Sequence, residues 1–302
     1  MNNYNYLIKK HDLEVSKVTK KGNITIITTP LGQFVFKNEN IKIYNYLLSR
    51  GFDYFPKIID YNEDTIMFKY INNIQYPFEQ KAEDYIKLLS LLHLKTNYFV
   101  KTNENEIKKT YEEVHNKIEE VNNYYNNLIN IIESKEYMSP CEYLIARNIS
   151  NIFMLLNYAF IELDKWYDLV KSNIKKRVCT LYNCIDINNL IKSTDGIYLT
   201  DFSKCIVDIP IYDLYNFFNR YYLDIDFVSL INRYEKIYKL SNDEKNLLYI
   251  LISVPDKIKI DNKVDEIFKI KKQINKIFIV INILNSKKEK DTSTHQEEDN
   301  KN

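Results

Sequence analysis

The stretch that decides the fold is RVCTLYNCIDINNLIKSTDGIYLTDFSKCIVDIPIYDLYNFFNR, residues 177–220. It begins as a short apolar strand, and a polar loop follows that ends in Asn188-Asn189. A hairpin over residues 190–200, with a Ser-Thr-Asp-Gly turn, then leads into Asp201-Phe202-Ser203. The pattern predicts a loop, a hairpin and a second loop, an arrangement in which an asparagine and an aspartate converge on one place.

The residues before this stretch change their hydrophobic period once. Residues 12–37 alternate with the two-residue period of strands, and two turns divide them into three antiparallel strands. Residues 41–50 have apolar side chains at helical spacing and stop at Gly51. Two more short strands are expected at 57–61 and 65–70. The sequence therefore predicts an N-terminal lobe, residues 1–76, made of a five-stranded antiparallel sheet and one helix.

The rest of the chain has the period of helices. We expect helices at residues 82–94, 104–136, 141–156, 158–173, 211–222, 226–238, 243–253 and 263–285. The C-terminal lobe thus covers residues 77–285 and is interrupted only by the hairpin near 187–201. The charged, polar residues 286–302 are expected to form a disordered tail. The fold class is α+β, with a sheet-containing lobe followed by a mainly helical lobe.

Composition excludes several classes of function. The net charge of +1 offers no electrostatic case for nucleic acid, so a helical nucleic-acid-binding protein is disfavoured. The four cysteines show no CxxC spacing and the four histidines no ligand spacing, which argues against a structural zinc site. The polar start MNNYNYLIKK and the lack of about 18 consecutive apolar residues predict no signal peptide and no membrane span. We therefore expect a cytoplasmic protein.

The decisive stretch resembles the catalytic region of aminoglycoside-phosphotransferase-like kinases and, among them, spore-coat proteins of the CotS and YsxE type. In that family the loop reads His-Gly-Asp, four residues, Asn and two apolar residues. Here Tyr182-Asn183-Cys184 occupies the first three positions, Asn189 the asparagine and Leu190-Ile191 the apolar pair. Asp201-Phe202-Ser203 matches the metal-binding Asp-Phe-x element. The resemblance covers residues 12 to about 285 and implies a protein-kinase-like fold with two lobes.

Two further segments resemble the family. Residues 210–214, Pro-Ile-Tyr-Asp-Leu, are similar to the segment that follows the metal-binding aspartate, and Leu92-His93 is similar to the end of the first helix of the C-terminal lobe. By itself, His93 is better explained as a half-buried structural histidine. Asp213 begins a helix, so its carboxylate is expected to accept backbone amides there or to brace the hairpin loop, at about 0.5–2 kcal/mol of stability.

Phosphoryl transfer in kinases needs several parts that this chain lacks or alters. The proton-accepting aspartate is replaced by Cys184, whose thiol has an ordinary pKa of about 8.5. Lys37 ends the third strand, but the helix 41–50 has no acidic residue to hold it and Glu39 lies before that helix. Lys37 is explained equally well as a surface lysine. The turn at 20–23 has one glycine and offers few backbone amides to phosphates.

The resemblance and its departures together predict a catalytically impaired kinase-like protein, a pseudokinase. No catalytic residue is expected, the base position being the degenerate Cys184. We expect at most weak ATP binding through Lys37, Asn189 and Asp201, with Asn189 and Asp201 as vestigial Mg²⁺ ligands.

The resemblance implies a spore-coat or spore-associated interaction component, made in the mother-cell cytoplasm and deposited on the coat. Its partners would be other coat or cytoplasmic proteins. The alternative is an active small-molecule kinase of the aminoglycoside or choline phosphotransferase type with a divergent catalytic loop, supported by the retained Asn189 and Asp201.

Overall fold

The computed structural model describes residues 4–22, 24–260 and 266–299, and the chain divides into two compact units. Unit 1 contains the segments Met1–Tyr98, Val178–Asp213 and Leu230–Lys239, and unit 2 the segments Phe99–Arg177, Leu214–Ser229 and Leu240–Asn302. The boundary that the sequence suggested near residue 76 falls inside unit 1. Main-chain hydrogen bonds explain why, because Ile74 N donates to Lys192 O at 2.8 Å and Leu199 N to Tyr54 O at 2.9 Å. These bonds join the hairpin to the N-terminal segment.

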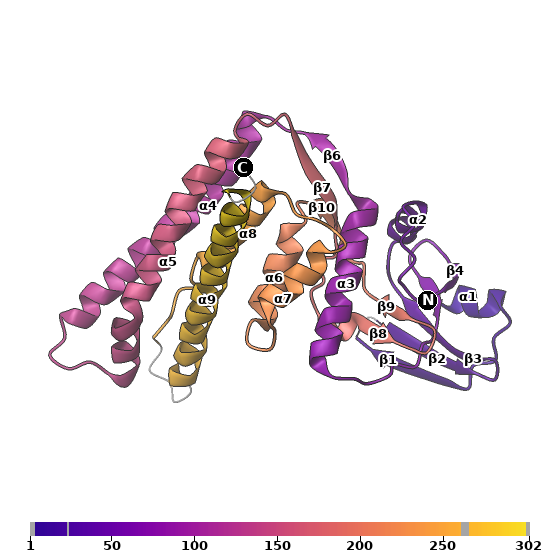
Figure 1. Ribbon diagram of the computed structural model, residues 1–302. Coiled ribbons are helices and arrows are strands. Elements are labelled where there is room, and N and C mark those ends of the chain that lie inside the picture. The colour runs from indigo at the N-terminus through magenta and orange to yellow at the C-terminus, as the bar shows by residue number, and fades with distance from the viewer. Residues whose placement is uncertain (1–3, 23, 261–265, 300–302) are drawn as a thin grey trace. The chain divides into compact units, whose positions relative to one another are not determined.

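A five-stranded antiparallel sheet forms the first part of unit 1 (Figure 1), as the sequence predicted. Its spatial order is β1-β2-β3-β5-β4. The strands are β1 (Lys17–Lys21), β2 (Ile24–Thr29), β3 (Gly32–Lys37), β4 (Ile58–Tyr61) and β5 (Ile66–Lys69). The helix α2 (Ile41–Ser49) follows β3 and begins at Asn40, whose side chain accepts from the Lys42 amide. The predicted α+β class and the order of the first lobe are confirmed.

A short helix that sequence analysis did not predict precedes the sheet. The helix α1 (Tyr4–Lys10) has one fully buried side chain, Leu7, which packs with Ile27, Phe36 and Met67. Its seven residues are too few to give a periodic signal in the sequence. Contact with the sheet therefore accounts for this helix better than its intrinsic propensity does.

The hairpin of unit 1 agrees with its prediction. A 3₁₀ turn at Ile187–Asn189 leads into β8 (Leu190–Lys192), which pairs antiparallel with β9 (Ile197–Leu199). Gly196, at φ +155°, occupies the turn where other residues would be strained. The helix α3 (Phe78–Thr96) buries one face in unit 1 and includes the fully buried His93.

Unit 2 is built from long helices. These are α4 (Glu104–Glu133), α5 (Pro140–Val170), α8 (Asn242–Ser253) and α9 (Glu266–Asp299). Figure 1 shows α4 and α5 side by side, and α5 also contacts α8 and α9. On α4 the buried residues recur every three to four positions from Val114 to Ile132, which is the stripe expected of a helix with one face in a core.

Three predictions for the helical region are wrong. The two helices expected at 141–156 and 158–173 are the single helix α5, because Asn157 between them does not interrupt the apolar period. The helix α9 continues through residues 286–299, where a disordered tail was expected; the lysines and glutamates there are good helix formers. Residues 300–302 of that tail, and 263–265 of the expected helix, lie outside the described part of the chain.

The third error concerns strands. The short apolar strand expected at the start of the decisive stretch is β7 (Lys175–Leu181), but it forms the centre of a sheet with the order β10-β7-β6, whose two other strands were not predicted. The edge strands β6 (Tyr98–Lys101) and β10 (Ile206–Asp208) have four and three residues. Such short strands carry too few positions for a period of two to be visible. Two more helices, α6 (Ile211–Tyr221) and α7 (Phe227–Glu235), lie near their predicted positions.

Among the described residues, one helix could cross a membrane by length and composition alone, namely α5. A core helix of a soluble protein passes the same test, and α5 packs against three other helices of unit 2. The absence of a membrane span stays a prediction.

The start of α5 provides a test of the fold. Ser139 Oγ accepts from the Glu142 amide at 3.3 Å, and the Glu142 carboxylate accepts from the Ser139 amide at 2.8 Å, which is a capping box. We expect Ser139→Ala to lower the free energy of unfolding by about 0.5–2 kcal/mol in urea titrations followed by circular dichroism. Ser134→Ala, which removes an exposed hydroxyl bonded to Ile131 O, should stay within about 0.5 kcal/mol of wild type. Equal effects of the two changes would contradict the assignment.

Candidate functional site

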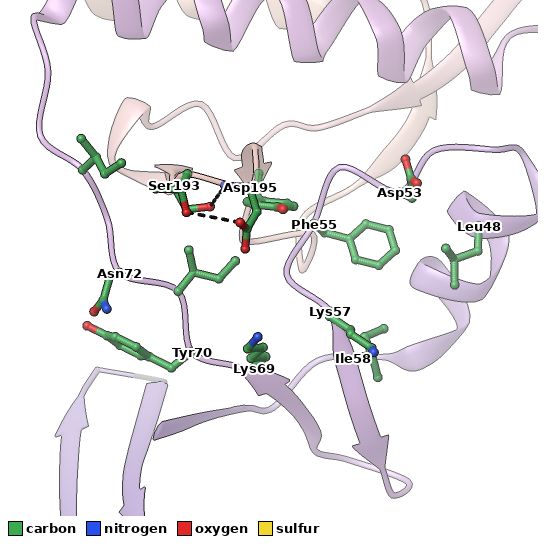
Figure 2. A pocket seen from close by; sticks show the side chains of 14 residues that line it. Leu48, Asp53, Phe55, Lys57, Ile58, Lys69, Tyr70, Asn72, Ser193 and Asp195 are labelled. Carbon is green, nitrogen blue, oxygen red and sulfur yellow. Dashed lines mark hydrogen bonds between the residues drawn. The ribbon is translucent and has the colours of Figure 1, made fainter. Parts of the chain in front are cut away.

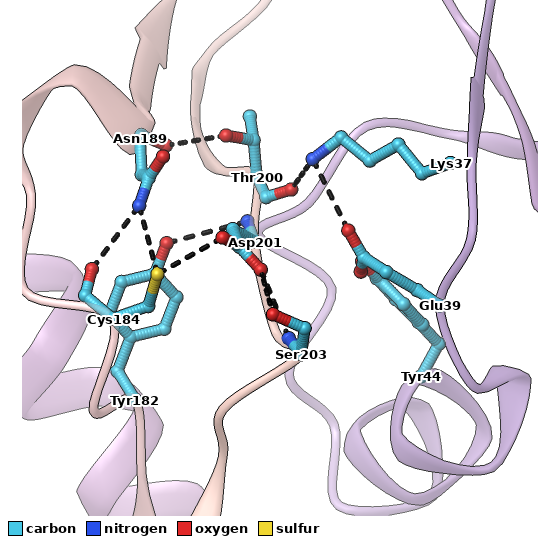
Figure 3. Close-up of polar contacts among 9 residues, drawn as sticks. All are labelled: Lys37, Glu39, Tyr44, Tyr182, Cys184, Asn189, Thr200, Asp201 and Ser203. Atoms are coloured by element: carbon cyan, nitrogen blue, oxygen red, sulfur yellow. Dashed lines mark hydrogen bonds and ion pairs between the residues drawn. The ribbon is translucent and has the colours of Figure 1, made fainter. Parts of the chain in front are cut away.

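Lys37 lies at the end of β3, with its side chain buried in unit 1 (Figure 3). Its Nζ contacts the Thr200 carbonyl oxygen and lies 3.4 Å from Glu39 Oε1. The second oxygen of Glu39 accepts a hydrogen bond from the Tyr44 hydroxyl of α2. The lysine therefore has an acidic partner, and the expectation that it lacked one is wrong. The partner comes from the loop before the helix, and a tyrosine in the helix holds it.

Cys184, Asn189 and Asp201 meet on the other side of the same site (Figure 3). The Cys184 thiol lies 3.0 Å from Asp201 Oδ2, in donor geometry. The Asn189 amide nitrogen donates to the Cys184 carbonyl at 3.2 Å and to its sulfur at 3.3 Å. The main-chain carbonyl oxygen of Asn189 accepts a hydrogen bond from the Thr200 hydroxyl at 3.0 Å. The residues that the sequence singled out thus converge, and they bond to one another.

Asp201 is kept ionised by its neighbours. Burial favours its protonated form, but hydrogen bonds from Ser203 and from the Cys184 thiol outweigh this and lower the pKa of Asp201. Ser203 supplies both its hydroxyl, at 2.6 Å, and its amide, at 3.1 Å, to Oδ1. The carboxylate therefore has one oxygen held by Ser203 and the other by Cys184.

The Cys184 thiol is poorly suited to accept a proton. Burial, followed by the hydrogen bond and the charge of Asp201, raises the pKa of Cys184 to about 11. At neutral pH the group is a protonated donor. The nearest alternative carboxylate, Asp186, accepts from the Asn188 amide at 2.9 Å and caps the 3₁₀ turn. It serves the loop's own structure.

The connection between β1 and β2 is short. Lys21 pairs with Ile24 in the β1–β2 ladder, so only positions 22 and 23 connect the strands. A phosphate cradle needs several successive backbone amides on a longer loop. The sequence prediction of a poor phosphate loop therefore agrees with the strand register.

An apolar pocket of about 140 Å³ lies beside Lys37. Its lining includes Ile26, Val35, Phe68 and Ile191, together with Thr200. Pockets for small ligands usually measure about 300–1,000 Å³, so this one is small for a nucleoside. Asp201 and Asn189 carry the oxygen atoms that Mg²⁺ prefers, but the thiol already occupies one carboxylate oxygen. Among the described residues no three His, Cys, Asp or Glu side chains form a metal cluster. The site fits a magnesium-bound nucleotide poorly.

A buried polar network supports the loop that carries Cys184. The Asp213 carboxylate is fully buried and accepts from the amides of Tyr182, at 2.7 Å, and Asn183, at 2.9 Å. His93 Nε2 lies 3.1 Å from the same carboxylate, and His93 Nδ1 lies 2.7 Å from the Tyr234 hydroxyl. Asn183 has a φ of +52°, a left-handed conformation that asparagine tolerates better than most residues. Asp213 thus braces the loop, one of its two expected roles, and His93 is fully rather than half buried.

Sequence reasoning missed Glu39 and Tyr44 as site residues. Both lie where the third strand passes into α2, and the helix contains no acidic residue. The signal available was the spacing Lys37-x-Glu39, which places two opposite charges two residues apart in an extended segment. Tyr44 gives no such signal, because its role depends on how α2 packs.

Removal of the Asp213 carboxylate should be more damaging than the sequence suggested. Asp213→Ala leaves two amides and His93 without their acceptor in a fully buried place, and each buried polar group left unsatisfied costs roughly 1–3 kcal/mol. Asp213→Asn keeps one acceptor oxygen and should lose less. Urea unfolding measures both, with exposed Asp224→Ala as the control. A loss below about 1 kcal/mol for Asp213→Ala would contradict the bracing role.

Alkylation should report the raised pKa of Cys184. The rate of its reaction with iodoacetamide should still rise between pH 8 and pH 10, because the thiolate forms only as the pH approaches the pKa of about 11. After unfolding in urea the rate should level off near the ordinary thiol pKa of about 8.5. Peptide mass analysis separates Cys184 from the other cysteines. A folded-state plateau below pH 9 would contradict the hydrogen bond to Asp201.

Comparison with known proteins gives a match in structure only. No protein-family model and no curated protein matches the chain. The structure is similar to an aminoglycoside phosphotransferase from Alicyclobacillus acidocaldarius subsp. acidocaldarius DSM 446, with a TM-score of 0.66, 11% identity and coverage of 93% of this chain and 94% of that one.

It is also similar to an AMP-bound spectinomycin phosphotransferase, with a TM-score of 0.52, 14% identity and coverage of 91% and 96%. A choline kinase from Streptococcus pneumoniae has a TM-score of 0.47, 17% identity and coverage of 90% and 98%. At these identities the similarity describes the fold alone. The chain has the kinase-like fold that is found in aminoglycoside phosphotransferases.

Proposed function

We propose that this protein is a pseudokinase, a kinase-like protein impaired in phosphoryl transfer, that works as an interaction component of the spore or its coat. The impaired transfer rests on one observation, the hydrogen bond of the Cys184 thiol. By its resemblance to the family Cys184 replaces the proton-accepting aspartate, and its thiol donates to Asp201 Oδ2 at 3.0 Å. A base in this position must take a proton from the substrate hydroxyl. Cys184 instead holds its own proton at neutral pH, since its pKa is raised to about 11.

Two further features support the loss of transfer. Asp186, the only other carboxylate in the loop, faces the amide of Asn188 and caps the 3₁₀ turn. The β1–β2 connection has two residues and offers no row of amides to a triphosphate. Each missing part of a phosphoryl-transfer site lowers the rate of transfer by orders of magnitude. Their combined loss leaves a fold that can bind other molecules but does not transfer phosphate.

The spore-coat assignment rests on the sequence resemblance alone. A kinase-like fold without transfer chemistry retains its surfaces, and binding to other proteins is the function that such surfaces can still perform. Its test is immunodetection of the chain in extracts of purified spore coats. Presence of the chain in vegetative cells and its exclusion from coat extracts would contradict this part of the proposal.

An active small-molecule kinase is the second candidate, and one observation favours it. The Lys37–Glu39 pair, with its oxygen–nitrogen distance of 3.4 Å, supplies the lysine and acid that kinases use on the nucleotide phosphates. Asn189 and Asp201 lie on the same site. In this alternative a substrate that displaces the Cys184 proton from Asp201 would free that carboxylate to serve as base or ligand.

Transfer of radiolabelled phosphate from ATP distinguishes the two. With Mg²⁺ and a panel of aminoglycosides, spectinomycin and choline, the wild-type chain should give no product above the level of Asp201→Ala. Cys184→Asp should also give none, because the short β1–β2 turn is unchanged. Thermal shift measures binding separately: a nucleotide present at 100 times its Kd would stabilise the fold by about 2.7 kcal/mol.

Lys37→Ala tests binding separately, since it removes one of the two lysines that line the pocket of about 140 Å³, the other being Lys69. A shift with ATP that Lys37→Ala abolishes, without transfer, agrees with the proposal. Phosphorylation of any substrate that is lost in Asp201→Ala would overturn it in favour of the active kinase.

A further inference from the structure

A second pocket in unit 1 is larger than the one beside Lys37. Its volume is about 830 Å³, within the range of sites that bind small ligands. Three segments line it: the loop between α2 and β4, the chain that follows β5, and the β8–β9 turn (Figure 2). It lacks every residue of the Lys37–Cys184–Asp201 site. It shares Lys69, Tyr70 and Ile71 with the lining of the smaller pocket beside Lys37, so the two pockets are neighbours along the segment that follows β5.

Main-chain hydrogen bonds join these three segments into a closed ring. Lys69 N donates to Lys57 O at 3.0 Å, Ile74 N to Lys192 O at 2.8 Å, and Leu199 N to Tyr54 O at 2.9 Å. Between these bonds the chain itself closes the ring, through residues 54–57, 69–74 and 192–199. The wall of the pocket is therefore preformed, and a ligand would bind without first ordering it.

Two lysines on the ring are main-chain neighbours across the β4–β5 pairing. Lys57 and Lys69 are directly opposite in the antiparallel β4–β5 pairing, which continues the register Ile58↔Phe68. Like charges directly opposite one another on adjacent strands destabilise a sheet. In the part of the chain that the structure describes, neither lysine side chain has a recorded ion pair or hydrogen bond. An anionic group placed between them would remove this repulsion.

Two aspartates lie elsewhere on the ring. Asp53 lies just before residues 54–57 of the ring. Asp195 lies in the β8–β9 turn, and Figure 2 shows it across the pocket from Lys69. The Asp195 carboxylate accepts from the Thr194 hydroxyl at 3.2 Å and, among the described residues, has no recorded ion pair. A pocket with cations on one side and carboxylates on another suits a ligand that carries both charges.

Apolar side chains occupy the space between these charges. Phe55 is buried, and Tyr70, Ile71 and Tyr198 are half-buried, while Leu48 is 49% exposed. Aromatic side chains provide large contact areas at low cost in conformational entropy. The middle of the ligand should therefore be apolar.

We propose that this pocket binds a short peptide segment of a partner protein, with an acidic residue against Lys57 and Lys69, an apolar residue in the middle and a basic residue toward Asp195. The assignment deepens the proposed interaction function and rests on it for the identity of the ligand as a protein. A free small peptide has the same chemistry, so the test includes both forms.

Binding of the full-length chain to an array of six-residue peptides tests the proposal. In the array the positions of one acidic, one basic and one apolar residue are permuted. The peptides are made with capped and with free termini. Capped peptides with the acidic and basic residues on opposite sides of the apolar one should bind, and fluorescence anisotropy of the best peptide gives its Kd. The double variant Lys57→Gln/Lys69→Gln should weaken binding at least tenfold. Lys57→Glu/Lys69→Glu should change the preference to peptides with a basic residue at that end.

The control is Lys17→Gln/Lys42→Gln, which removes the same charge from exposed positions that do not line the pocket and should leave the Kd unchanged. The single change Lys69→Gln should raise the Tm, because it removes the like-charge pair. Absence of peptide binding, binding of free but not capped peptides, equal loss in the control, or a lower Tm for Lys69→Gln would each overturn the proposal. Because phosphate transfer is not measured here, such a failure leaves the proposed loss of transfer untouched.

Discussion

The buried carboxylate of Asp213 is the constraint on which the site depends. A carboxyl group with no exposed surface must have its oxygens hydrogen-bonded, because a buried polar group without partners destabilises the fold. Asp213 meets this requirement with the amides of Tyr182 and Asn183 and with His93. Those amides belong to the residues just before Cys184, so one electrostatic requirement joins α3, the start of α6 and the loop of the candidate site. The position of Cys184 is a consequence of this pairing.

A group of aromatic rings extends the same organisation to the sheet. Phe202, buried directly after Asp201, contacts Tyr44 and Tyr182 with ring centroids 5.4 Å apart, and Phe55 at 5.9 Å. Edge-to-face contacts of this kind add stability beyond the burial of area. Through this one ring, α2, the loop before β4 and the loop of Cys184 share a core. Asp201 is held in place by the packing of its neighbour as much as by its own hydrogen bonds.

Sequence reasoning could predict the elements with a strong local signal. The spacing from Cys184 to Asn189 and on to Asp201 predicted a loop and a hairpin, and the structure brings these three residues together. The spacing Lys37-x-Glu39 was a local signal for the partner of Lys37, but the hydrogen bond from Tyr44 to Glu39 depends on how α2 packs, which no local pattern reveals. Strand β10 and helix α1 were missed because each is too short to show a hydrophobic period in the sequence. Their conformation is decided by neighbours in space. The errors lie where tertiary contact outweighs local propensity.

The ion pair of Lys37 has a consequence for how such a protein could be controlled. In protein kinases the acidic partner sits on the helix after the third strand, so displacement of that helix separates the charges and turns the enzyme off. Here Glu39 is two residues from Lys37 along the backbone, and α2 contributes only the Tyr44 hydroxyl. Displacement of the helix would cost one hydrogen bond and leave the two charges together. Movement of α2 therefore cannot switch this ion pair off, and regulation of this fold would have to act on another part of the molecule.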